Sequence, residues 1–318
     1  MKSGLLCKLI FVSAIALMIM AGCGQNAEMK LVPADKSVTT YKVVTGQSKD
    51  YQFIQPSINK TKERHTGGDI VMVFTQQIES VDAQGNAVAN ITIKQLKQTS
   101  TDSQGKEIGF DSESEKDKTS PLMQLIGASY KIKFSPKGSV EVVDASAARA
   151  AVKGGADEKI AARLLSDEEI ARRHQVMAFQ DAKGTYKKGD TWSSVVASPA
   201  GMLRSISFEK TYTLTDVKEE NGNTIATIEM NAVPSSKKVE GTAPDAGGMG
   251  MFAQMFDEKD NYTGKMIVNL TTGQIKSYDE TLKAEWVAAE SSEEQKSDKG
   301  PDQLTMGFTY KYSIERVD

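Results

Sequence analysis

The chain has 318 residues, of which 39% are hydrophobic and 25% charged, with a formal net charge of −3. This length and apolar content suffice for a sizeable core, so a wholly disordered chain is excluded. The slight negative charge argues against nucleic acid as a partner, because phosphate binding requires a strong excess of basic residues. Two cysteines and two histidines supply too few soft ligands for a structural zinc site, and we expect no metal and no cofactor.

Residues 1–22 have the layout of an export signal. Lysines flank the start of an apolar run over residues 9–20, which is too short to span a bilayer, since a spanning helix needs about 20 apolar residues. Met20-Ala21-Gly22-Cys23 resembles the bacterial lipobox, in which the cysteine is acylated and cleavage occurs before it. An ordinary secretory signal with an incidental cysteine is the alternative. We expect a mature chain that begins at a lipidated Cys23 and is anchored to a membrane by acyl chains.

The residue after this cysteine is Gly24, whereas the inner-membrane retention signal of lipoproteins in well-studied Gram-negative bacteria has aspartate there. By this resemblance we expect the protein in the cell envelope, at the outer membrane and facing the periplasm where the cell has one. Cys7 leaves with the signal and Cys23 becomes a thioether, so the mature chain forms no disulfide. Residues 23–38 are mostly polar or small, and we expect the lipidated cysteine to be followed by a flexible tether.

Beyond the tether the hydrophobic pattern has the period two of β-strands. Shorter stretches with this period occur over residues 206–214 and 282–288. The sequence therefore predicts a mainly β, antiparallel fold. The pattern is clearest near the C-terminus, where polar or small residues alternate with Leu304, Met306, Phe308, Tyr310, Tyr312 and Ile314.

Two segments of the chain resemble each other, which indicates an internal repeat. Residues 74–93 resemble residues 212–230, and their turn glycines, Gly85 and Gly222, lie 137 positions apart. Hairpins with glycine turns resemble each other in general, which is the alternative explanation. Because further turns match in the same order at a similar offset, duplication of a β unit is favoured.

Residues 145–180 form the helical stretch that the sequence predicts between the two β units. Ser166-Asp167-Glu168-Glu169 has the form of a capping box, and Gly154-Gly155 separates this helix from an earlier one. We expect a helical connection packed on the sheet. The fold expectation is two related antiparallel units over residues 39–144 and 181–318, each curved like a half-barrel.

Each β unit contains an apolar segment that does not alternate and that follows a polar stretch. Flexible Met, Phe and Leu side chains adapt to apolar surfaces of varied shape, which suits a lid over a hydrophobic cavity. The alternative is that both segments are short covering helices that complete the core. We expect hydrophobic ligand contacts from Leu122, Met123, Leu125, Ile126, Met249, Met251, Phe252, Met255 and Phe256.

General signals of catalysis are poor. The chain contains no Gly-x-Ser-x-Gly elbow, no phosphate-binding loop and no His-Glu-x-x-His pair. His65 lies in a polar stretch, and His174 follows two arginines near a predicted helix end, where a cation is favourable. We therefore expect no catalytic residues and a protein that is not an enzyme, with an envelope hydrolase as the third alternative.

Three short motifs, Gly189-Asp190-Thr191-Trp192, Phe110-Asp111-Ser112 and Ser135-Pro136-Lys137-Gly138, resemble those of a poorly characterised family of bacterial envelope lipoproteins, a domain of unknown function. This resemblance covers most of residues 39–290 and supports the fold more than the function. At the level of architecture, the chain is also similar to the half-barrel lipoprotein carriers and the mycobacterial lipid-binding lipoproteins.

We expect a lipid-anchored envelope protein that is not an enzyme and that binds a hydrophobic or amphipathic ligand, such as a lipid, in a groove of its β-sheet. A structural lipoprotein, or one that binds another envelope protein and has no ligand cavity, is the alternative.

Replacing the cysteine of the lipobox tests the anchor. Cys23→Ser should abolish acylation and cleavage at that site and leave unprocessed precursor in the membrane, because the thiol is the acceptor. Mass spectrometry of the wild-type amino terminus should find an acylated chain that starts at Cys23. An unmodified terminus at another residue would contradict the lipoprotein interpretation.

Overall fold

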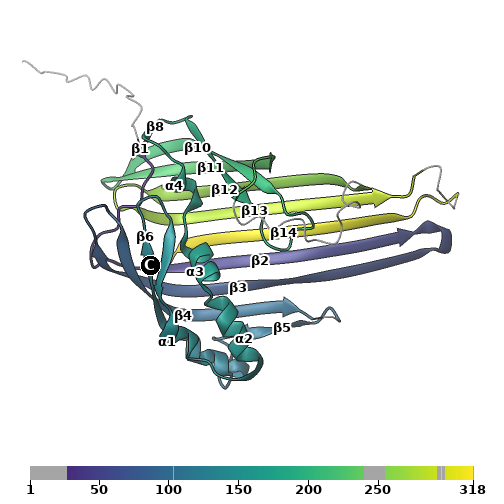
Figure 1. Cartoon of the computed structure of the whole chain (residues 1–318), viewed down its shortest axis with the longest axis horizontal. Helices are drawn as coiled ribbons and strands as arrows, with labels where there is room; N and C mark the ends of the chain where they lie inside the picture. Colours follow the sequence, from purple (N-terminus) through teal and green to yellow (C-terminus); the bar gives the residue numbers. More distant parts are fainter. Residues whose placement is uncertain (1–26, 103, 240–254, 292–294, 296–297, 318) are drawn as a thin grey trace, which may run out of the picture.

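One antiparallel sheet of twelve strands dominates the computed structural model, which describes residues 27–102, 104–239, 255–291, 295 and 298–317 (Figure 1). The strands are β1 (Ala27–Glu28), β2 (Val38–Gln55), β3 (Lys60–Val81), β4 (Ala87–Thr101), β5 (Glu107–Asp111), β6 (Ser129–Phe134), β7 (Val140–Asp144), β8 (Thr185–Tyr186), β9 (Thr191–Ala197), β10 (Ser207–Glu220), β11 (Asn223–Ser235), β12 (Asp257–Asn269), β13 (Gln274–Ala289) and β14 (Gln303–Arg316). The helices are the short η1 (Pro56–Ile58), η2 (Glu115–Asp117) and η3 (Pro121–Leu125), then α1 (Ser146–Arg149), α2 (Gly155–Leu164), α3 (Asp167–His174) and α4 (Met177–Gln180).

The sheet consists of two meanders that meet where the first long strand pairs with the last strand. Its order is β7-β6-β4-β3-β2-β14-β13-β12-β11-β10-β9, with β5 paired to β4, and β1 pairs with β8 in a separate small sheet. The junction runs from the pair Tyr41–Arg316 to the pair Ile54–Gln303. The mainly β, antiparallel expectation is confirmed.

The strands of residues 39–144 and 181–318 form one continuous sheet and not two separate ones. Without the pairing of β2 and β14, each of these long strands would present a row of unpaired backbone N–H and C=O groups. Pairing them satisfies both rows at once, which explains why two predicted units appear as a single layer.

The helical connection forms where the sequence predicts it and covers one face of the sheet at one end of the strands (Figure 1). Ser166 is the N-cap of α3, and its Oγ accepts a hydrogen bond of 3.2 Å from the backbone N–H of Glu169. Tyr312 Oη on β14 donates to the carbonyl oxygen of Arg173, 3.0 Å away. We call this covered side the inner face of the sheet.

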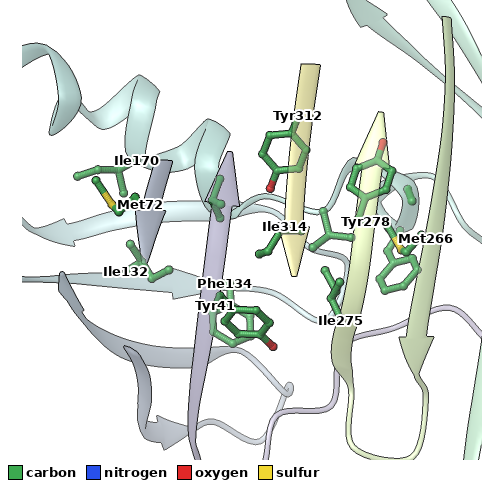
Figure 2. Packing of buried hydrophobic residues seen from close by; sticks show 14 of the residues in the cluster. Tyr41, Met72, Ile132, Phe134, Ile170, Met266, Ile275, Tyr278, Tyr312 and Ile314 are labelled. Carbon is green, nitrogen blue, oxygen red and sulfur yellow. The ribbon is translucent and has the colours of Figure 1, made fainter. Parts of the chain in front are cut away.

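The alternation near the C-terminus produces a buried inner face, as predicted. Phe308, Tyr310, Tyr312 and Ile314 are at most 8% exposed, whereas Lys311 is exposed on the other side. Figure 2 shows Tyr312 and Ile314 on β14 beside Tyr278 and Ile275, with other core side chains contributed by the neighbouring strands and by the helical layer. Period two therefore identified the core-facing residues from Phe308 to Ile314 correctly, whereas Leu304 and Met306 are only partly buried.

Residues 27–37, expected as part of a flexible tether, pack against the sheet instead. Met29 is fully buried, and the backbone N–H of Leu31 donates to the carbonyl oxygen of Pro136 at 2.8 Å. The turn before β13 approaches this segment so closely that a Cβ on Gly273, where φ is 65°, would lie 1.8 Å from the nitrogen of Val32. The polar composition of the segment suggested a tether, but three of its apolar side chains are buried in the core: Ala27, Met29 and Leu31.

Substitutions on opposite faces of β14 test the assignment of its core face. Phe308→Ala should lower the free energy of unfolding by about 3–5 kcal/mol, because a buried aromatic side chain is lost and a cavity remains. Thr309→Ala, on the other face, should be nearly silent. Urea titration of both variants measures the difference, and equal small effects would show that the alternation does not mark a buried face.

Candidate functional site

The apolar segment of the first β unit belongs to the core. Leu122 and Leu125 are 2% and 0% exposed, and Ser120 Oγ caps the short helix η3 by accepting from the N–H of Leu122 at 3.3 Å. Met123 and Ile126 are partly buried and pack against the same core. This placement agrees with the alternative that the segment completes the core.

The second apolar segment falls largely outside the described residues, including Met249, Met251 and Phe252. Of its described members, Met255 is 66% exposed and Phe256 is partly buried against the core. Ligand contacts from this segment therefore stay a prediction.

Residues 198–206, between β9 and β10, form a loop over the inner face that sequence reasoning missed. The ends of the loop are joined, because the backbone N–H of Ser198 donates to the carbonyl oxygen of Ile206 at 2.8 Å. Its middle reaches β2, where a Cβ on Gly201 would lie 3.5 Å from the side chain of Lys49. Arg204 Nη1 lies 2.5 Å from Glu258 Oε2 on β12. The geometry is that of an Ω-loop, a compact loop with adjacent ends.

A cavity of about 670 Å³ lies between this loop and the sheet, beyond the helical layer. Met202 and Leu203 project from the loop, and both pack partly buried against the core. Tyr51, at 39% exposed, marks the side that meets solvent. The sheet contributes Lys49, Asp50, Tyr51, Arg64, Thr66, Trp286, Met306, Gly307 and Phe308.

The strand register places two rows of residues across five strands of the inner face, and the members on β3, β2, β14 and β13 include the floor of this cavity. Each row starts on β3, crosses β2, β14 and β13, and ends on β12. Apolar residues occupy the middle of both rows, on β14 and β13. The first row is Arg64, Tyr51, Met306, Trp286 and Glu258, and the second is Thr66, Lys49, Phe308, Ala284 and Asp260.

Charge is separated along these rows. Lys49 and Arg64 are exposed on the β2–β3 side, and neither has an ion-pair partner within the part of the chain that the structure describes. Glu258 and Asp260 lie on the β12 side, where Glu258 is paired with Arg204. With adjacent strands about 4.8 Å apart, Lys49 and Asp260 are separated by roughly 14 Å.

Several buried polar atoms on the β12–β13 side have no hydrogen-bond partner among the residues that the structure describes. They are the indole Nε1 of Trp286, Oε1 of Glu258 and both carboxylate oxygens of Asp260. Burial, with the nearby charge of Glu258, raises the pKa of Asp260 to about 6. Such unpaired buried groups are uncommon in folded proteins, because each loses its hydration without compensation.

A deeper hollow of about 450 Å³ contains a polar cluster that is internally satisfied. The buried Lys210 Nζ lies 2.6 Å from Glu280 Oε2 and 4.7 Å from the ring centre of Tyr262. Tyr262 and Tyr278 donate to the two oxygens of Glu280 at 3.0 and 2.5 Å. Burial and the carboxylate of Glu280 raise the pKa of both tyrosines well above the ordinary value, so both remain protonated donors.

A third hollow, of about 400 Å³, links the other two along the inner face. It shares the lining residues Lys49 and Thr66 with the first cavity. It shares Glu169 and Arg172, which form an ion pair, with the hollow that contains the polar cluster. The three hollows form one groove beneath α2, α3 and the 198–206 loop, apolar at one end and polar at the other. We call it the inner-face groove.

Sequence reasoning identified Phe308 and Met306 as inner-face residues but not as cavity lining. Trp286 belongs to the alternating pattern of residues 282–288, which predicted that its side chain is buried. No local sequence pattern indicates that Lys49 and Arg64 line the cavity. Their position on the same face depends on the pairing of β2 with β14 and with β3.

Among the described residues, no helix is long and apolar enough to cross a membrane. The same part of the chain contains no group of three or more His, Cys, Asp or Glu side chains arranged to hold a metal ion.

Comparison with known proteins gives a family match and distant structural similarities. The model of a family of unknown function, DUF6263, matches residues 84–275. No curated protein sequence matches the chain.

Among solved structures, one described as showing lipid–protein interactions in lipovitellin is similar over 88% of this chain, at 11% identity and a TM-score of 0.37. The chain spans only 25% of the length of that protein. A DUF1329 family protein from Desulfovibrio piger is 7% identical, with 86% of this chain and 85% of that one covered and a TM-score of 0.14. OpdQ of Pseudomonas aeruginosa is 9% identical, with 87% and 97% covered and a TM-score of 0.15. At these identities none of the similarities extends to function.

The raised pKa of Asp260 predicts a specific dependence of stability on pH. The folded state keeps a proton on Asp260 up to a pH of about 6, whereas the unfolded state releases it near the ordinary value of 3.8. Stability should therefore fall as the pH rises through this window, and the loss should persist above it. Asp260→Asn should raise the melting temperature at a pH of about 7.5 and have little effect at about 4.

Asp257→Asn, an exposed change on the same strand, is the matched control and should leave the pH profile unchanged. Thermal melts across the pH range measure both variants. A wild-type profile that is flat between these values would show that the carboxylate of Asp260 is not desolvated.

Proposed function

We propose that this chain, which belongs to the DUF6263 family of unknown function, is a non-enzymatic, lipid-anchored envelope protein that binds a hydrophobic or amphipathic ligand in its inner-face groove. The observation that carries the proposal is the cavity of about 670 Å³ beneath the 198–206 loop. Ligand sites typically enclose roughly 300–1,000 Å³ and combine apolar walls with a few polar groups. The cavity has this size and this composition.

The walls of the cavity suit a flexible apolar chain. Trp286 and Phe308 form an aromatic floor, and Met306 and Met202 add unbranched thioethers that adapt to a ligand's shape. The 198–206 loop is joined to the sheet at its two ends and by the ion pair of Arg204 with Glu258. It forms a roof that a ligand could displace without disrupting the strands.

The predicted anchor at Cys23 would place the β-sheet close to a membrane surface. Three residues separate Cys23 from Ala27, which is already packed in β1. At about 3.5 Å per residue, this connection spans at most roughly 14 Å. A chain acylated at Cys23 would thus hold its β-sheet near the bilayer, at the outer membrane and facing the periplasm where the cell has one.

The rival is a structural lipoprotein, or one that binds another envelope protein, in which the apolar segments only complete the core. The burial of Leu122 and Leu125 supports this rival for the first segment. The cavity beneath the loop favours ligand binding, because a purely structural sheet has no need of an open hollow beside Trp286.

The histidines give no support to the third alternative, a hydrolase. His174 Nε2 lies 2.7 Å from the hydroxyl of Tyr130, and burial holds the pKa of His174 well below its usual value. Its ring contacts Phe74 edge-on. His65 is exposed and lies beside Asp50. Both placements are those of structural residues.

The two meanders also support the idea of a duplicated β unit. Gly85 lies in the turn between β3 and β4, and Gly222 lies in the turn between β10 and β11. Along the sheet, each set of strands follows the same sequential order, as expected for a tandem duplication whose copies pair edge to edge.

A charge placed in the roof of the cavity tests ligand binding. The processed chain, residues 23–318 with Cys23→Ser, is titrated with the neutral fluorescent amphiphile N-phenyl-1-naphthylamine, and dodecanol is used to displace it. The wild type should bind both, and Leu203→Asp should weaken binding at least about tenfold, because the new carboxylate must remain hydrated in an apolar cavity.

Val143→Asp, at an exposed position on the distant strand β7, is the control and should bind like the wild type. A thermal melt confirms that both variants are folded. A folded wild type that binds neither probe would leave the structural rival standing.

A further inference from the structure

The charges around the cavity distinguish its two sides. On the β2–β3 side, Lys49 and Arg64 face the cavity without an ion-pair partner among the described residues. The ion pair nearest to them, Asp50 with His65, lies on adjacent register positions, so these two side chains point to the opposite face of the sheet. The side of the cavity that meets solvent is therefore cationic.

The β12 side has the opposite character. The carboxylate of Asp260 is buried and unpaired, and Glu258 shares its charge with only one cation, Arg204. Between the two sides lie Met306 and Phe308 on β14, and Trp286 on β13. A ligand placed across the rows thus meets two cations, then an apolar floor, then a carboxylate.

From this arrangement, and resting on the proposed function, we infer that the ligand is an anionic amphiphile whose headgroup is held by Lys49 and Arg64. Its apolar chain lies over Met306, Phe308 and Trp286 beneath the roof formed by Met202 and Leu203. The carboxylates on β12 repel a negative headgroup, so they disfavour the reverse orientation.

The two cations suit a headgroup with at least two equivalent oxygens. The planar guanidinium of Arg64 offers paired donors to a carboxylate or a phosphate, and the ammonium of Lys49 contributes a compact charge. Trp286 lines the cavity through its ring, and its indole N–H is buried without a hydrogen-bond partner among the described residues. A fatty acid and a phosphate-bearing lipid share this chemistry.

Three probes with the same alkyl chain and different headgroups separate the contribution of the headgroup charge to binding from that of the chain. Dodecanoate, dodecyl phosphate and dodecanol are each used to displace N-phenyl-1-naphthylamine from the processed chain. At low ionic strength at least one anion should bind about tenfold more tightly than the alcohol, and added salt should reduce this preference. Preference for the carboxylate identifies a fatty-acid site, and preference for the phosphate identifies a phospholipid-headgroup site.

The decisive variant is Lys49→Gln with Arg64→Gln, which removes both cations and keeps side chains of similar length. It should lose the preference for the anion, about tenfold, and retain the wild-type affinity for dodecanol. The matched control is Lys283→Gln with Lys311→Gln, which removes two exposed charges from the outer face of β13 and β14. This control should keep the preference.

Each outcome is decisive. If none of the probes binds, the proposed function itself fails. If dodecanol binds as well as the anions, or if the outer-face control loses the preference equally, the anionic headgroup is overturned while ligand binding stands. Tighter binding of dodecylamine than of dodecanoate would also overturn it, by placing the headgroup at Asp260.

Discussion

The pairing of β2 with β14 determines the rest of the architecture. It joins the start of the first meander to the end of the second, so β7 and β9 become the two ends of the strand order, with β5 as a short side strand on β4. The chain must then pass from one edge to the other between residues 145 and 190, and the shortest route crosses a face of the sheet. Helices α1–α4 follow that route, which is why one face is covered (Figure 1). The helical layer is therefore a consequence of the strand pairing.

The same constraint explains where the groove lies. The strands beside the junction are long, and the helical layer covers only one of their ends (Figure 1). At the other end, aromatic side chains such as Trp286 and Phe308 would face water if only the helices covered the sheet. The 198–206 loop extends over them but leaves a hollow, because a loop that carries Met202 and Leu203 cannot fill the space that a packed helix would fill. The polar cluster around Glu280 is different, since its members satisfy one another's hydrogen bonds.

Local pattern was enough to predict the parts of the fold that depend on neighbouring residues. The buried alternation over residues 308–314 and the helix start capped by Ser166 are set by strand and helix geometry, and both were predicted correctly. The single continuous sheet was not predictable from local pattern, because β2 and β14 are separated by almost the whole chain. The groove depends on the same pairing, so the sequence alone could not show that Lys49 faces the cavity. Residues 27–37 were predicted to be a flexible tether because most of them are polar or small. Burial of a few apolar side chains such as Met29 is nevertheless enough to hold a short segment against the sheet.

The unpaired polar atoms on the β12–β13 side favour a ligand site over an incidental gap in packing. Of the seven buried side-chain atoms without a partner in the described residues, four belong to Trp286, Glu258 and Asp260, and they lie in one patch. Each unsatisfied buried group costs about 1–3 kcal/mol, so this patch reduces the stability of the fold. Hydrophobic side chains at these positions would relieve the cost if packing were the sole role of the strands. Polar groups held without partners beside an apolar hollow are instead typical of sites whose hydrogen bonds are completed by a bound molecule. The unsatisfied acceptors lie on β12, and the cations without an ion-pair partner among the described residues lie on β2 and β3, so under the proposed function charge would orient the ligand.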